Sequence, residues 1–213
     1  MPESELYKKT GSRGRRVALA AFALWFFSVS AGVLWMTRYS NIPGPHESVP
    51  AHWPASSAIA LARTNSTLVM FAHPHCPCTR ASINELEVLL ARTQGRISAH
   101  VLFLQPPGMD ATWTDTSLLR QAAAIPGVTV QQDTDGAEAR RFGSATSGDT
   151  VVYGADGRLL FHGGITISRG HEGDNPGLST IVGLFQSRPV ETAQAPVFGC
   201  SLFSTHCPEK GPL

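Results

Sequence analysis

Apolar and polar residues follow two different patterns along this chain. From Val17 to Met36 there are twenty consecutive residues without a charged side chain. Farther along, short apolar runs alternate with segments in which apolar residues recur every three or four positions, patterns typical of buried strands and of helices. The chain is therefore predicted to contain one long apolar helix followed by an α/β domain.

The α/β domain is predicted to hold a mixed parallel and antiparallel sheet of four or five strands, with helices on both faces. An Asp156-Gly157 step between two β-rich runs is the strongest short-range signal for an antiparallel hairpin. The predicted strands are 67–72, 97–104, 128–132, 150–153 and 159–162, and the predicted helices are 55–63, 78–93, 113–124, 137–142 and 175–187.

The apolar stretch 17–36 has the length of a membrane-spanning helix, since about 20 apolar residues cross the hydrocarbon core of a bilayer. Five basic residues precede it and Arg38 follows it, so the positive-inside rule places the N-terminus in the cytoplasm and the rest of the chain outside. A cleaved signal peptide is the alternative, because Ser28-Val29-Ser30 resembles a cleavage site. The apolar run continues through Met36, which favours a retained anchor.

Composition limits the kinds of partner that the chain can have and indicates its domain organisation. The chain has 213 residues, 15% of them charged, and a net charge of +1, so no overall basic balance indicates nucleic-acid binding. Residues 37–57 are rich in proline and polar residues and read as a linker. The predicted organisation is a basic cytoplasmic N-terminus 1–16, an anchor 17–36, a linker 37–57, a domain 58–187 and an irregular tail 188–213.

The most informative motif is His73-Pro74-His75-Cys76-Pro77-Cys78, placed where a predicted strand ends and a helix begins. A helix N-terminus carries partial positive charge and stabilises a thiolate. Proline is favoured at the first helical position, so Pro77 is expected there with Cys76 as the N-cap. Cys76 is then the expected nucleophile in disulfide exchange.

Several arrangements of the four cysteines remain open at this point. Residues i and i+2 of a helix do not face each other, so a Cys76–Cys78 disulfide would be strained and labile. Cys76 can instead form a redox pair with Cys200, or the two motif cysteines can bind Cu(I) or Zn(II). A structural alternative has static bridges from the motif to Cys200 and Cys207.

Other residues are candidates for supporting roles. In the metal alternative the ligands are Cys76, Cys78, His73 and His75. His75, Pro77, Arg169 and His171 are candidates to support the redox site, because a cation near the cysteines would favour a thiolate. The segment around Cys200 either folds back onto the domain or forms a tail loop through a Cys200–Cys207 bridge.

The element order, with cysteines at the first strand-to-helix junction, resembles the thioredoxin-like fold, a three-layer α/β/α sandwich with a mixed central sheet. GADGRLLFHGG (154–164) resembles the hairpin that closes that fold. The closest layout is that of membrane-anchored thiol-disulfide oxidoreductases of the cytochrome-maturation type. HPHCPCTRAS (73–82) and GGITISRGHEGDN (163–175) resemble the bacterial RedB-like group.

The chain departs from these families at two positions. Such oxidoreductases use Cys-x-x-Cys, whereas this chain has one residue between Cys76 and Cys78. They usually place a cis-proline before the hairpin, where this chain has Gly148. The threonine that peroxiredoxins place three residues before their reactive cysteine is also missing, since His73 stands there.

The resemblance implies an enzyme of disulfide exchange. Among the candidate catalytic residues Cys76, Cys78 and Cys200, Cys76 is expected to attack the partner disulfide, and Cys78 or Cys200 to resolve the mixed disulfide. It implies a single-pass protein of the bacterial inner membrane with its domain in the periplasm, and a protein thiol or disulfide as the partner. No organic cofactor is expected, because the phosphate-binding motif GxxxxGK[ST] is not found in the sequence. The alternatives are a copper- or zinc-binding delivery protein and a non-catalytic, disulfide-stapled binding domain.

Overall fold

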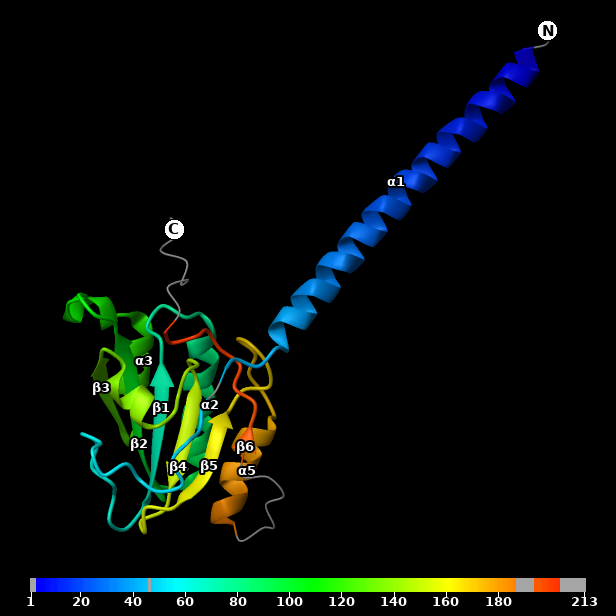
Figure 1. Ribbon diagram of the computed structural model, residues 1–213. Coiled ribbons are helices and arrows are strands. Elements are labelled where there is room, and N and C mark those ends of the chain that lie inside the picture. The colour runs from blue at the N-terminus through cyan, green and yellow to red at the C-terminus, as the bar shows by residue number, and fades with distance from the viewer. Residues whose placement is uncertain (1–2, 46, 187–193, 204–213) are drawn as a thin grey trace. The chain divides into compact units, whose positions relative to one another are not determined.

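The computed structural model describes residues 3–45, 47–186 and 194–203. The chain divides into two compact units, Met1–Asn41 and Ile42–Leu213. Figure 1 shows a single long helix in the first unit and a sheet with covering helices in the second.

The first unit is the helix α1 (Glu3–Ser40). Its segment Gly14–Ser40 is apolar and long enough to cross a membrane. These 27 residues span about 40 Å at 1.5 Å per residue, which exceeds the bilayer core of about 30 Å. The helix extends four residues beyond the predicted limit Met36, into the segment predicted as a linker.

The second unit contains a six-stranded sheet in the order β3-β2-β1-β4-β5-β6. Strands β1, β2 and β3 are parallel, β4 is antiparallel to both β1 and β5, and β6 is parallel to β5. The strands are β1 (Ser66–Ala72), β2 (Ile97–Gln105), β3 (Val128–Thr134), β4 (Asp149–Tyr153), β5 (Leu159–Gly164) and β6 (Gln194–Ala195).

Helices and loops cover both faces of this sheet. Because side chains alternate along a strand, Leu68 and Met70 of β1 face one core and Val69 and Phe71 face the other. The first core also takes residues of α2, α3 and α5, and the second takes residues of α4 and of the segment before β1. The helices are α2 (Cys78–Thr93), η1 (Ala111–Thr114), α3 (Ser117–Ala124), α4 (Ala137–Arg141) and α5 (Pro176–Phe185). The predicted thioredoxin-like three-layer fold is confirmed.

Three details differ from the expectations. No helix forms over 55–63, where the Ala58 N–H bonds to Glu138 Oε1 at 3.0 Å instead of to a helical carbonyl. The predicted helix 113–124 is divided into η1 and α3, because the Thr116 hydroxyl caps a new start by accepting from the Leu119 N–H. The tail predicted as irregular contributes the short strand β6, so the sheet has one strand more than expected.

The start of α5 follows the expected chemistry. Asn175 is the N-cap, and its Oδ1 accepts from the Leu178 N–H at 2.8 Å. The next turn passes very close to β5: a Cβ atom added at Gly177 would lie 2.0 Å from the carbonyl oxygen of Gly164. Only glycine permits this contact between helix and strand.

We therefore expect Gly177→Ala to destabilise the protein. Alanine gains about 1 kcal/mol of helix propensity over glycine, but overpacking against backbone costs about 1–3 kcal/mol. The midpoint of thermal unfolding of the full chain in detergent should fall by a few degrees, at about 2–4 °C per kcal/mol. The exposed Ser179→Ala on the same helix is the matched control and should leave the midpoint unchanged. A higher midpoint for Gly177→Ala would contradict the close contact.

Candidate functional site

The loop from His73 to Pro77 connects the buried strand β1 to α2 and carries Cys76. The Cys76 N–H donates to the His73 carbonyl at 3.2 Å, and the Thr79 N–H donates to the Cys76 carbonyl at 3.0 Å. Pro77 is the N-cap and Cys78 the first residue of the helix. Pro77 already has helical dihedral angles, φ −62° and ψ −27°, so the predicted cap at Cys76 differs from the assigned one by a single residue.

The second part of the site is the segment Val197–Leu202, which folds back beside the residues that precede β4. The Ser147 N–H donates to the Cys200 carbonyl and the Leu202 N–H donates to the Ala145 carbonyl, each at 2.8 Å. These bonds flank an antiparallel bridge between Thr146 and Ser201. Of the two expectations for Cys200, the structure has the one in which its segment folds back onto the domain. Cys207 lies outside the described residues.

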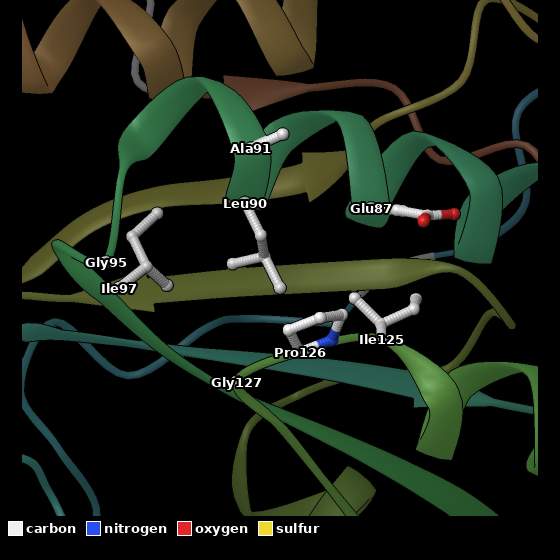
Figure 2. Close-up of a pocket in the computed structure, with 8 residues that line it drawn as sticks. All are labelled: Glu87, Leu90, Ala91, Gly95, Ile97, Ile125, Pro126 and Gly127. Atoms are coloured by element: carbon white, nitrogen blue, oxygen red, sulfur yellow. The ribbon is translucent and has the colours of Figure 1, made fainter.

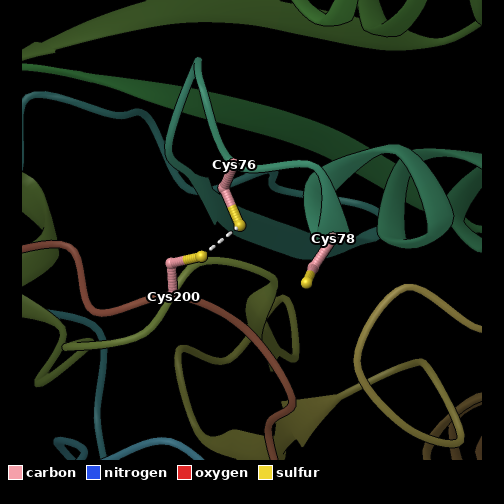
Figure 3. A group of neighbouring side chains, drawn as sticks. All are labelled: Cys76, Cys78 and Cys200. Carbon is pink, nitrogen blue, oxygen red and sulfur yellow. Dashed lines mark hydrogen bonds between the residues drawn. The ribbon is translucent and has the colours of Figure 1, made fainter. Parts of the chain in front are cut away.

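Together these segments bring three sulfurs into one cluster, shown in Figure 3. The Sγ atoms of Cys76 and Cys200 are 2.8 Å apart, and those of Cys76, Cys78 and Cys200 all lie within 4.8 Å of one another. Cys76 is buried, while Cys78 and Cys200 are half-buried. In the described part of the chain all three are free thiols.

The cluster concentrates negative charge on Cys76. The Cys200 thiol, and to a lesser extent the Cys78 thiol, hydrogen-bonds to the Cys76 sulfur and holds its pKa far below the usual value, against the opposing effect of burial. The pKa of Cys200 is raised because its proton is held in the bond to Cys76. For Cys78, the bond with Cys200 lowers the pKa, but donation to Cys76 and burial outweigh it, so the net shift is upward. One thiolate is therefore shared among three sulfurs.

Arg169 lies beside the cluster, as the sequence analysis anticipated. Its guanidinium donates to the carbonyl of Gly199, the neighbour of Cys200, and also to the Ile42 carbonyl at 3.3 Å. Its positive charge lowers the pKa of Cys78. His171 is exposed, and its Nδ1 lies 2.8 Å from the Arg169 carbonyl, so its contact is with the loop of Arg169.

The two histidines of the motif face Trp113. His73 is buried, and burial lowers its pKa, which favours the neutral ring. Its Nδ1 accepts from the His75 N–H at 3.2 Å. His75 is exposed; its Nε2 lies 3.1 Å from the Trp113 carbonyl, and the two rings pack edge-on at 4.3 Å.

Sequence reasoning missed the buried hydroxyls that support the motif loop. Ser147 Oγ accepts from the His73 N–H at 2.9 Å, and the Thr79 hydroxyl lies 2.8 Å from Ser147 Oγ and donates to the His73 carbonyl at 3.1 Å. Ser147 thus holds the motif loop through its side chain and the Cys200 segment through its N–H. In the sequence, the position of Ser147 directly before Gly148 was the signal that could have identified this residue.

Gly148 is in a left-handed conformation with φ +89°, and its N–H donates to the Phe71 carbonyl at 2.7 Å. A Cβ atom there would lie 2.6 Å from Ser82 Oγ, so the position requires glycine. No peptide bond is cis among the residues that the structure describes. The residues just before Gly148 are paired with the segment that carries Cys200.

A surface hollow of about 490 Å³ lies elsewhere, between the C-terminal end of α2 and the loop after α3 (Figure 2). It is lined by Glu87, Leu90, Ala91, Gly95, Ile97, Ile125, Pro126 and Gly127. The cysteines are at the opposite end of α2, so this hollow takes no part in their chemistry.

Two solved structures show the same fold, and a third has a lower similarity. An uncharacterized conserved protein from Geobacillus kaustophilus matches with a TM-score of 0.54 and 17% identity, over 79% of this chain and 96% of that one. A hypothetical protein from Sinorhizobium meliloti 1021 matches with a TM-score of 0.54 and 18% identity, over 79% of this chain and 97% of that one. A secreted disulfide oxidoreductase from Mycobacterium tuberculosis gives a TM-score of 0.37 and 20% identity, over 46% of this chain and 67% of that one.

The first two likenesses establish the fold alone. No protein-family model matches the chain, and the search of curated proteins found no match.

We expect Cys200→Ala to raise the pKa of Cys76, because it removes the largest contribution that lowers this pKa. In a Cys207→Ser background, the rate of Cys76 alkylation should reach its plateau at a higher pH than in the parent protein, as followed by mass spectrometry of the Cys76 peptide. Cys78→Ala is the matched control and should give a smaller shift in the same direction. If the pH midpoint of Cys76 alkylation in Cys200→Ala is the same as in the parent protein or lower, the proposed charge distribution is contradicted.

Proposed function

We propose that this protein is a membrane-anchored thiol-disulfide oxidoreductase that acts outside the cytoplasm. The observation that carries the proposal is the 2.8 Å separation of the Cys76 and Cys200 sulfurs just before α2. Disulfide exchange requires a stabilised thiolate and a second thiol placed to attack the first. The pair of Cys76 and Cys200 meets both requirements.

The reaction begins when the Cys76 thiolate attacks one sulfur of a partner disulfide. A mixed disulfide forms, and the other partner sulfur leaves as a thiolate that takes up a proton. The Cys200 thiol then gives up its proton and attacks the Cys76 sulfur. A Cys76–Cys200 disulfide forms and the second partner thiol leaves, so the partner gains two electrons and two protons. The reverse sequence oxidises a partner dithiol.

Cys200, rather than Cys78, is the resolving cysteine in this proposal. The sulfur of Cys78, the first residue of α2, lies within 4.8 Å of the other two sulfurs, whereas the direct sulfur–sulfur contact at 2.8 Å is between Cys76 and Cys200. The tail segment instead presents Cys200 directly to Cys76. Cys78 and Arg169 are positioning residues: Cys78 hydrogen-bonds to the Cys76 thiolate, and Arg169 holds Gly199.

The proposed partner is a protein with a redox-active disulfide or dithiol, and the exchange uses no organic cofactor because electrons pass directly between sulfurs. A second dithiol protein returns the oxidised form to its reduced state. The basic residues in the first part of α1, the apolar length that follows them, and the motifs that resemble the RedB-like group support a location in the bacterial inner membrane with the domain in the periplasm.

We expect Cys76→Ser to abolish disulfide exchange with a model disulfide peptide, because the attacking sulfur is lost. Cys200→Ser should still attack but should accumulate the mixed disulfide on Cys76. Cys78→Ser should retain most of the exchange activity, and Cys207→Ser is the control with little effect. The measurements are fluorescence of the released thiol and mass spectrometry of the mixed disulfide.

Equal, negligible exchange by the parent protein and Cys76→Ser would overturn the proposed function in favour of a non-catalytic domain. Accumulation of the mixed disulfide in Cys78→Ser but not in Cys200→Ser would move the resolving role to Cys78.

We expect alkaline phosphatase, which is active only outside the cytoplasm, to be active when fused to the C-terminus of the full chain in a bacterial host. Deletion of residues 17–36 should abolish this activity. Mass spectrometry of the intact protein from the membrane fraction should give a mass that includes the basic N-terminal residues. An inactive fusion would refute the orientation, and a mass that begins after Ser30 would show a cleaved signal peptide instead of an anchor.

A further inference from the structure

We propose that the reduced protein binds one Cu(I) ion through the sulfurs of Cys76, Cys78 and Cys200. This function is separate from disulfide exchange, because metal binding needs three reduced sulfurs and no partner. It also differs from the ligand set suggested by the sequence, which combined two cysteines with two histidines.

The spacing of the sulfurs fits a single three-coordinate ion. With metal–sulfur bonds of about 2.3 Å, three sulfurs around an ion in their plane are about 4 Å apart. The three Sγ atoms already lie within 4.8 Å of one another. Cys76 and Cys200, now 2.8 Å apart, would separate by about 1 Å, a distance within reach of side-chain rotation alone.

The kind and number of ligands favour Cu(I). Thiolates are soft ligands that select Cu(I) and zinc among the biological metals. Structural zinc sites are almost always tetrahedral with four protein ligands. The cluster holds three ligand atoms among the residues that the structure describes, which is a complete set for a trigonal Cu(I) ion.

One ring nitrogen of each histidine is engaged outside the cluster. His73 Nδ1 accepts from the His75 N–H, and His75 Nε2 lies 3.1 Å from the Trp113 carbonyl. The third ligand comes instead from Cys200, 124 positions away from Cys76 along the chain. The fold, not the motif, therefore completes the site.

The surroundings suit a negatively charged metal–thiolate group. Three thiolates and one Cu(I) carry a net charge of −2, next to the positive end of α2 and the Arg169 guanidinium. Cys76 is buried, whereas Cys78 and Cys200 are half-buried, so the ion can enter from their side. Binding releases the thiol protons to solvent and transfers no electron, and a Cys76–Cys200 disulfide would exclude the ion.

The test is an anaerobic titration of the reduced full chain in detergent, in a Cys207→Ser background, with Cu(I) and the chromophoric competitor bicinchoninate. We expect one Cu(I) per chain, and X-ray absorption should show three sulfur neighbours at about 2.3 Å. Cys76→Ser, Cys78→Ser and Cys200→Ser should each weaken binding more than about 100-fold, beyond the effect usual for loss of a second-shell partner. The protein with a Cys76–Cys200 disulfide should not compete with bicinchoninate for Cu(I).

Two comparisons make the result decisive. Disulfide exchange by the parent protein, measured on the same preparation, separates the two proposals: exchange without Cu(I) binding contradicts the metal site alone, and Cu(I) binding without exchange contradicts the oxidoreductase alone. Circular dichroism of each cysteine variant shows whether it folds. His75→Ala should bind Cu(I) like the parent. A loss in His75→Ala equal to that in the cysteine variants, tighter binding of Zn(II) than of Cu(I), or unchanged affinity in Cys200→Ser would overturn the site.

Discussion

The antiparallel pairing of the tail with the segment before β4 is the interaction on which the site depends. Two backbone hydrogen bonds, Ser147 to Cys200 and Leu202 to Ala145, fix the position of the Cys200 backbone. Gly199 makes the approach possible, since a Cβ atom there would lie 1.9 Å from the Ser147 carbonyl oxygen. Without this pairing Cys76 would face only Cys78, its awkward neighbour on the helix. The tail is thus part of the site as fully as the motif is.

The pairing has an electrostatic consequence that links the two proposed functions. A buried thiolate is costly unless hydrogen bonds or charges stabilise it. Here the thiols of Cys200 and Cys78 supply those hydrogen bonds to Cys76, so the cluster carries one negative charge at a moderate cost. The same closeness that lets Cys200 attack Cys76 also gathers three soft ligands around one point. Redox exchange uses two of these sulfurs, whereas a metal ion uses all three.

Local patterns in the sequence predicted the fold well, because β1, α2 and the β4–β5 hairpin are specified by short-range periodicity and turn residues. The errors lie where distant residues decide. Residues 55–63 do not form a helix because Ser57 and Ala58 bond to the side chain of Glu138. β6 has only two residues, too few for a pattern. The sequence did not decide whether the Cys200 segment folds back onto the domain or forms a tail loop, because no residue near Cys200 in the sequence indicates that it pairs with Ser147.

Burial of Cys76 adds a constraint on how a partner reaches it. Its side chain has 0% exposed surface, so a partner disulfide cannot meet the sulfur while the tail is paired. Opening the tail breaks its two backbone bonds, at about 0.5–1.5 kcal/mol each, together with the Arg169–Gly199 and Cys76–Cys200 hydrogen bonds. Val197 and Leu202 remain anchors because they are buried on either side of the site. A partner can reach the Cys76 sulfur only when the stretch between these two residues moves aside, so disulfide exchange at this site requires local opening of the tail.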